Sequence, residues 1–213
     1  MKVNITRIKN EVLLDFFSPR HHVCNSSSPS LDSVLGRSTV FQSIAMLFDR
    51  VFVTVGTTEF NELVDELDGE NFLQFLHMKG CRYLTLQLGR GKLPSLMESL
   101  CEKYHIAFQW YRFKDNLQDD LHRATLIISH AGAGTIMECL EMKKILIVCV
   151  NTTLMNNHQT ELAEEMALQK YCIATVPEKL VNTLSEEFHT QLRAYPDTDF
   201  HIFPKYLNAL FQG

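Results

Sequence analysis

The sequence predicts an α/β fold in which one parallel β-sheet carries helices on both faces. From Val51 onward, short segments rich in β-branched and aromatic residues alternate with segments whose apolar residues recur every three or four positions. The short segments are almost continuously apolar, as expected of strands that are buried on both faces. Alternation of strand and helix is typical of parallel sheets wrapped by helices. A single domain is expected, because 213 residues with 46% hydrophobic content suffice for one core.

The expected strands are the apolar runs themselves. Near-continuous apolar runs of this length, bounded by polar or glycine-containing segments, are typical of strands in a buried sheet. In chain order they are Val51–Val55, Tyr83–Leu88, Ile106–Trp110, Thr125–Ser129, Ile145–Val150 and Tyr171–Thr175.

The segments between the strands have helical spacing. Sheets of this kind bind their ligands outside the carboxyl ends of the strands, so the loops that follow strands are the candidates for function. The expected helices are Phe60–Leu67, Leu96–His105, Asn116–Arg123, Thr135–Lys143, Asn157–Gln169 and Glu178–Ala194.

Residues 1–50 differ from the rest and are expected to form an irregular N-terminal extension. The segment His21–Ser30 is polar and rich in serine, as linkers are, and short mixed segments flank it. Asp49 and Arg50 mark the expected join to the domain formed by residues 51–213. The extension has no assigned role, and we expect the domain to fold and act without it.

Composition argues against several classes of function. The formal net charge is −5 and no basic run is present, which disfavours binding to nucleic acid or anionic lipid. No apolar stretch approaches the roughly 20 residues that span a bilayer, and no signal peptide is evident, so a soluble or peripheral protein is expected. The chain offers no metal-ligand spacing, and we expect no metal and no cofactor. The six cysteines form no CxxC pair, which predicts buried reduced thiols.

The loop after the first expected strand contains Gly56, Thr57 and Thr58. Glycine permits a tight turn, and the amides at the start of the following helix attract anions, so a phosphate group could bind here. The loop matches neither of the common glycine-rich phosphate motifs. A turn in which Thr57 or Thr58 caps the helix explains the same residues equally well.

The strongest local signal is a run of small residues after the fourth expected strand. Small residues let the backbone approach a ligand at a helix start, although they could also serve close packing of helix on strand. Glu138 lies roughly one helical turn after Gly134, so its carboxylate could reach a sugar hydroxyl, and we favour ligand binding. The run consists of His130, Ala131, Gly132, Ala133, Gly134 and Thr135.

The loop after the fifth expected strand brings amides and an imidazole together without charge. Asn157, His158 and Gln159 suit hydrogen bonding to sugar hydroxyls or an acetamido group. Alternatively, Asn156 or Asn157 caps the next helix and the remaining side chains are solvated. The residues alone favour neither interpretation.

An aromatic strand end, Phe108–Phe113, precedes a helix that Asp115 or Asn116 could cap. A nucleotide base could stack on these rings. Half-buried aromatic residues of a strand more often belong to the core, and on the residues alone core packing is the favoured interpretation.

Four segments are specific when taken in order: Val51–Thr58, Tyr111–Asp115, Ile128–Thr135 and Leu154–Gln159. Together they closely resemble the small catalytic subunit of the eukaryotic dolichol-linked N-acetylglucosaminyltransferase. The resemblance extends from about Val51 to about Gln212.

This resemblance implies a Rossmann-like domain, the C-terminal, donor-binding half of a GT-B glycosyltransferase of the family 28 type. Such a subunit would transfer N-acetylglucosamine from UDP-N-acetylglucosamine to dolichol-diphosphate-N-acetylglucosamine, with a β-1,4 linkage, in the second step of N-glycan precursor synthesis. A separate membrane-anchored subunit would supply the acceptor side of a heterodimer. The implied location is the cytoplasm and the cytosolic face of the endoplasmic reticulum membrane, with the chain held there through its partner.

The resemblance also implies residue roles. The loop after the first strand would face the diphosphate, and the run after the fourth strand would face the phosphate and ribose, with Glu138 on the ribose hydroxyls. Arg112 and Phe113 would contact the uracil. The amide and imidazole group after the fifth strand would contact N-acetylglucosamine.

An inverting transfer needs a base that deprotonates the acceptor hydroxyl and groups that stabilise the departing UDP. His130 is a candidate base because imidazole titrates near neutral pH. The resemblance implies that the base lies on the acceptor side, so we expect His130 to position the donor.

Two other functions compete with the transferase. The first is an inactive nucleotide-sugar-binding or scaffold module that acts through a partner, and the retained Glu138, His158 and Gln159 argue against it. The second is an NAD-dependent oxidoreductase. It is disfavoured because no GxGxxG follows the first strand and no acidic residue ends the second, which continues as Gln87–Arg90.

The C-terminal segment has apolar residues at near-helical spacing after Pro204, among them Tyr206, Leu207 and Leu210. Such a helix either packs on its own domain or docks a partner. The resemblance demands a partner, and we therefore favour docking.

Overall fold

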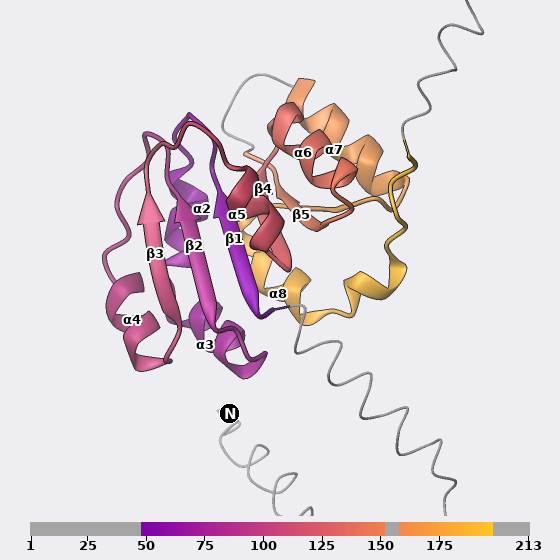
Figure 1. Ribbon diagram of the computed structural model, residues 1–213. Coiled ribbons are helices and arrows are strands. Elements are labelled where there is room, and N and C mark those ends of the chain that lie inside the picture. Colours follow the sequence, from indigo (N-terminus) through magenta and orange to yellow (C-terminus); the bar gives the residue numbers. More distant parts are fainter. Residues whose placement is uncertain (1–47, 152–157, 198–213) are drawn as a thin grey trace, which may run out of the picture. The chain divides into compact units, whose positions relative to one another are not determined.

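The computed structural model describes residues 48–151 and 158–197, and it confirms the predicted α/β fold (Figure 1). Within these ranges six strands form one parallel sheet in the order β3-β2-β1-β4-β5-β6. All neighbouring pairs are parallel, so the carboxyl ends of the strands lie at one edge. The strands are β1 Arg50–Thr54, β2 Tyr83–Gln87, β3 Ala107–Tyr111, β4 Leu126–His130, β5 Ile145–Cys149 and β6 Ile173–Thr175.

Helices cover both faces of the sheet, as predicted (Figure 1). The α-helices are α2 Asn61–Leu67, α3 Glu70–Met78, α4 Met97–Lys103, α5 Gln118–Arg123, α6 Ala133–Glu141, α7 His158–Leu168 and α8 Leu180–Ser185. Two short 3₁₀ segments, η2 Pro177–Lys179 and η3 Phe188–Gln191, flank α8.

Alternation along each strand divides the core into two clusters. Val51 and Val53 of β1 point into a cluster shared with α2, α3, α4 and α8, whereas Phe52 points into a cluster shared with α5, α6 and α7. The same alternation continues in β4, where Ile127 joins the second cluster and Ile128 the first. Successive side chains of a strand face opposite ways, so nearly continuous apolarity is what a sheet covered on both sides requires.

Two segments differ from the expected elements. Helix α3 follows α2 directly and has no counterpart among the expected helices, although its Phe72, Leu73, Phe75 and Leu76 have helical spacing and are buried. The expected helix Glu178–Ala194 is wrong as one element, because α8 ends at Ser185 and Glu186 is extended. The Ser185 hydroxyl donates to the Asn182 carbonyl, a local bond that competes with helix continuation.

Burial of Phe188 gives a second reason for the break. Phe188 is buried and packs in the first core cluster, and Leu192 packs against the same cluster. Turning the chain after α8 brings both side chains onto the core, and this burial outweighs the hydrogen bonds that a continuous helix would have made.

The described cysteines agree with the expectation of buried reduced thiols. Cys81, Cys101, Cys139, Cys149 and Cys172 are buried free thiols. Burial raises the pKa of the Cys149 thiol to about 12, so it stays protonated at neutral pH. Among the described helices, none has the length and apolarity needed to cross a bilayer.

The expected N-terminal extension and the expected C-terminal helix fall on residues 1–47 and 198–213, which lie outside the described residues. The first described residue is Phe48, whose side chain is 2% exposed and packs edge-on against Phe75. Asp49 pairs with Arg82, and Arg50 begins β1. Phe48 to Arg50 are therefore bound to the folded domain.

Replacing Phe48 by alanine should lower the free energy of unfolding by about 3 kcal/mol, because a buried ring is lost from the core. Urea denaturation of the full chain measures the change. The matched control is Met78→Ala, since Met78 is 69% exposed and its truncation should cost less than about 0.5 kcal/mol. Equal losses in the two variants would contradict the assignment of Phe48 to the core.

Candidate functional site

Loops after β1, β3 and β4 meet at the carboxyl edge of the sheet around a pocket of about 280 Å³. Several residues that sequence analysis placed in the site line it together, which is the arrangement expected of a parallel sheet. A second pocket, of about 210 Å³, lies beside α5 near the amino ends of β2 and β3 and contains none of the expected site residues. The first pocket is lined by Gly56, Thr57, Gln87, Phe113, Lys114, Leu117, His130, Gly132, Gly134 and Thr135.

Gly56 forms a tight turn directly after β1. Its φ of +72° lies in the left-handed region, where residues with a Cβ atom are strained. Thr57 and Thr58 follow as exposed residues, and Thr57 lines the pocket. Neither threonine caps the next helix, because α2 begins after Phe60 and has no side-chain cap bond. The capping interpretation of this loop is therefore wrong.

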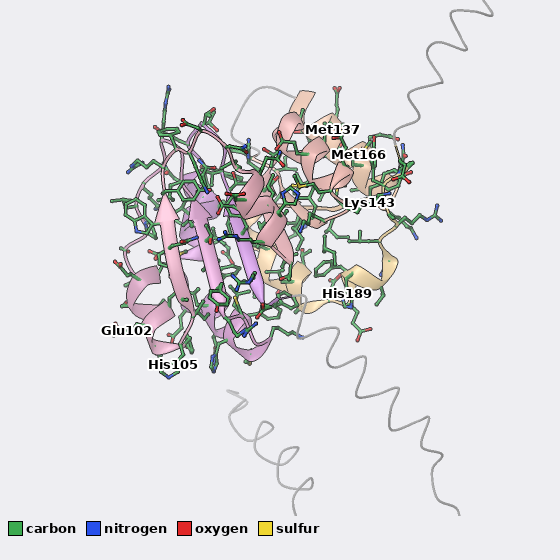
Figure 2. All side chains as sticks on the ribbon, in the orientation of Figure 1. Glu102, His105, Met137, Lys143, Met166 and His189 are labelled. Atoms are coloured by element: carbon green, nitrogen blue, oxygen red, sulfur yellow. The ribbon has the colours of Figure 1, made fainter. Side chains whose placement is uncertain are left out.

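The imidazole of His130 lies between two glycines. A Cβ atom on Gly56 would stand 2.4 Å from its Cε1 and Nε2 atoms, and one on Gly132 would stand 2.3 Å from Nε2. These distances are far below van der Waals contact, so both positions must lack a side chain while His130 keeps this place. Another histidine, His105, lies at the amino end of the strands, opposite the site (Figure 2).

Burial lowers the pKa of His130 below its usual range. The nearby backbone of Thr54 opposes this shift to a lesser extent, without a well-formed hydrogen bond. Within the described residues, the buried Nδ1 atom has no hydrogen-bond partner. The ring is therefore neutral at pH 7.

Helix α6 begins at the pocket with an open amino end. Gly132 is its N-cap, no side chain makes a cap bond, and no acidic residue lies in its first turn. The first amides of a helix have no partner within it and carry partial positive charge, so this end attracts an anion. A Cβ atom on Gly134 would meet nothing within 4 Å, so at this position the small residue does not serve packing.

The residues after β3 have two different environments. Phe113 is 56% exposed and lines the pocket, where its ring can stack on a planar group. Arg112 is engaged elsewhere, because its Nη1 atom donates to the carbonyls of Gly89 (3.2 Å) and Gly91 (2.8 Å). Its guanidinium therefore secures the loop after β2 and is outside the pocket lining.

The remaining expected site residues either do not line the pocket or are not described by the structure. Glu138 is exposed on α6 and is not among the lining residues, and Ala131 is buried beneath the loop. Asn157 is outside the described residues. His158 and Gln159 begin α7, as expected for a helix starting near His158, but their side chains are not described.

Three residues that line the pocket were not among the expected site residues: Gln87, Lys114 and Leu117. A glutamine that ends a buried strand was available as a signal, because such a side chain needs partners for four hydrogen bonds. Lys114 pairs with Asp120 at 2.9 Å and brings a cation to the pocket. The described part of the chain contains no group of three potential metal ligands.

Comparison with known proteins agrees with this geometry. Residues 50–206 match the glycosyltransferase family 28 C-terminal domain. The chain is 48% identical over 120 residues to the UDP-N-acetylglucosamine transferase subunit ALG13 of Mus musculus, a match that covers 55% of this chain and 10% of the mouse protein. It is 31% identical over 157 residues to the protein of the same name in Candida glabrata, covering 59% of this chain and 79% of that protein.

A solved structure agrees as well. An NMR solution structure of ALG13 aligns with a TM-score of 0.53 and 25% identity, over 74% of this chain and 94% of that one. The chain thus spans only about a tenth of the mouse relative but most of the shorter fungal one. This chain belongs to the glycosyltransferase family 28 C-terminal domain family and, within it, to the ALG13 family of UDP-N-acetylglucosamine transferase subunits.

Proposed function

We propose that this chain is the donor-binding, catalytic subunit of an N-acetylglucosaminyltransferase. It transfers N-acetylglucosamine from UDP-N-acetylglucosamine to dolichol-diphosphate-N-acetylglucosamine in the second step of N-glycan precursor synthesis. The observation that carries the proposal is the pocket at the carboxyl edge, where the open end of α6 and a neutral imidazole face one cavity in a chain of this family. Names of relatives support the donor, since they are UDP-N-acetylglucosamine transferase subunits.

The diphosphate of the donor binds between the Gly56 turn and the start of α6. Helix amides there supply partial positive charge, and the ammonium of Lys114, which pairs with Asp120, lies at the same pocket. These groups stabilise the negative charge that grows on UDP as the glycosidic bond breaks, which is the main way this chain accelerates transfer.

The uracil stacks on Phe113, the exposed aromatic ring of the pocket. Arg112 acts on the base indirectly, because its guanidinium holds the neighbouring loop. Glu138 reaches the ribose hydroxyls from the second turn of α6. The amides and imidazole of Asn157, His158 and Gln159 contact the sugar.

His130 positions the donor rather than removing the acceptor proton. Its ring is confined between Gly56 and Gly132 and is not free to follow an incoming hydroxyl. An inverting transfer then takes its base from the acceptor side, on a membrane-anchored partner subunit.

The partner also sets the location. Because the acceptor is a membrane lipid, the complex works at the cytosolic face of the endoplasmic reticulum, and this chain is held there peripherally. The C-terminal segment after Pro204 docks the partner in this proposal.

Transfer of radiolabelled N-acetylglucosamine to a dolichol-linked acceptor tests the proposal. The chain co-expressed with the membrane subunit should make the disaccharide product, and either protein alone should not. Donor binding without any transfer by the complex would instead identify an inactive nucleotide-sugar-binding module.

Glu138→Ala should weaken donor binding by about 1.5–3 kcal/mol, since a charged hydrogen bond to the ribose is lost. Calorimetric titration of the assembled complex with UDP-N-acetylglucosamine measures the affinity. Glu141→Ala is the matched control, because Glu141 is also exposed and is the last residue of the same helix, farther from the pocket than Glu138. Unchanged affinity in a folded Glu138→Ala protein would sink the ribose assignment.

The free energy of unfolding of the chain should decrease as the pH is lowered, partly because of His130. The pKa of His130 is lower in the folded chain than in the unfolded one, so the unfolded state binds the proton first. The stabilising contribution is complete above the unfolded pKa of about 6.5 and is lost as the pH falls from there toward the folded pKa. Urea midpoints between pH 7.5 and 5.5 should therefore drop more for the unchanged chain than for His130→Gln.

The same titration tests contact with the donor. A diphosphate beside the ring favours its charged form, so saturating UDP-N-acetylglucosamine should reduce the difference between the two proteins. If the difference between the two proteins is the same with and without donor, the assignment of His130 to the diphosphate is refuted.

A further inference from the structure

The side chain of Gln87 is buried at the carboxyl end of β2 and is only 3% exposed. Its Oε1 atom accepts hydrogen bonds from the Thr54 hydroxyl at 2.5 Å and from the Gly56 amide at 3.0 Å. Its Nε2 atom donates to the carbonyls of Gly56 and Arg112, both at 2.7 Å. The amide thus uses both donors and both acceptor sites of its oxygen.

These partners allow one orientation of the Gln87 amide. Its oxygen faces an N–H group and a hydroxyl, and its nitrogen faces two carbonyls. A flipped amide would set its oxygen against two carbonyl oxygens and its NH₂ group against the Gly56 amide. The side chain is therefore fixed, and so are the backbone groups that it binds.

Gln87 connects two walls of the pocket. On one side it holds both backbone groups of Gly56, the residue against which the His130 ring lies. On the other side it holds the carbonyl of Arg112, the residue before Phe113. The amide of Gly89 donates to the same carbonyl at 3.1 Å, so the loop after β2 is joined to this connection.

We propose that Gln87 is a positioning residue for donor binding, which sets the separation between the Gly56 turn and Phe113. The diphosphate and the base of one nucleotide must reach these two walls at once, so a change in their separation weakens both contacts together. The identity of the donor rests on the proposed function. The connection itself rests on the hydrogen bonds of Gln87.

Gln87→Met in the full chain removes all four hydrogen bonds while keeping a side chain of similar length. Two readouts are needed. Hydrogen–deuterium exchange should speed up at the Gly56 amide, which loses its acceptor, and this readout requires no ligand. Calorimetric titration with UDP should show binding weakened by about tenfold, because the two walls lose their fixed separation.

The kinetic pattern separates positioning from general damage. In the complex with the membrane subunit, Gln87→Met should raise the KM for UDP-N-acetylglucosamine by about tenfold, while kcat at saturating donor changes less. A loss of folded protein alone would lower the apparent kcat and leave KM unchanged.

Thr85→Val is the matched control. Thr85 lies two residues earlier on the same strand, and its hydroxyl accepts a hydrogen bond from Gln109 at 2.9 Å. This variant loses a polar contact of the sheet without touching either loop. Its UDP affinity and its exchange rate at Gly56 should match those of the unchanged chain.

Thr54→Val provides a milder second variant in case Gln87→Met folds poorly. It deletes the hydroxyl that orients Gln87 and leaves three of the four hydrogen bonds, so UDP binding should weaken by about threefold. UDP affinities within twofold of the unchanged chain in both variants would overturn the inference while the proposed function stands. An unchanged chain that binds no UDP would contradict the proposed function itself.

Discussion

The site depends on the alignment of buried polar side chains at one edge of a parallel sheet. The register pairs Thr54 of β1 with Gln87 of β2 and with Ser129 of β4, and all three side chains are buried. Polar groups that cannot reach water must bond to protein, and at the end of a strand the nearest free partners are the backbone groups of the following loops. The sheet therefore shapes the loops beyond it through hydrogen bonds as well as through apolar packing.

The resulting pocket is better suited to binding a ligand than to removing a proton from one. Its polar groups include backbone amides, a neutral imidazole, two threonine hydroxyls and one lysine, and they suit an anionic, planar ligand more than they suit proton removal from a hydroxyl. In the proposed function, this chain contributes binding and charge stabilisation, and its partner contributes the acceptor and the base. Such a division lets a small chain be specific for its donor and still depend on assembly for turnover.

Much of the fold was predictable, because buried parallel strands have a simple sequence pattern and each expected strand lies within two residues of an observed one. The loops that carry Gly56 and His130 were predictable for the same reason, since they follow strands. Helix α3 was readable from its spacing but was missed beside α2. The end of α8 at Ser185 was harder to predict, because it depends on the packing of Phe188 in the first core cluster, which is a tertiary contact.

Local sequence could mark Gln87 as a polar residue that ends a buried strand, but it could not give the hydrogen-bond partners of Gln87 or of Arg112. These partners lie in loops that follow other strands. They are the carbonyls of Gly89 and Gly91 for Arg112, and those of Gly56 and Arg112 for Gln87. Contacts between residues about 25 positions apart leave no periodic signal.

A different constraint follows from the two glycines beside His130. Gly132 has an ordinary φ of −74°, so only the imidazole excludes a side chain there, whereas Gly56 is also held by its positive φ. Among descendants of this chain, loss of the histidine should free position 132 to drift, while position 56 stays glycine.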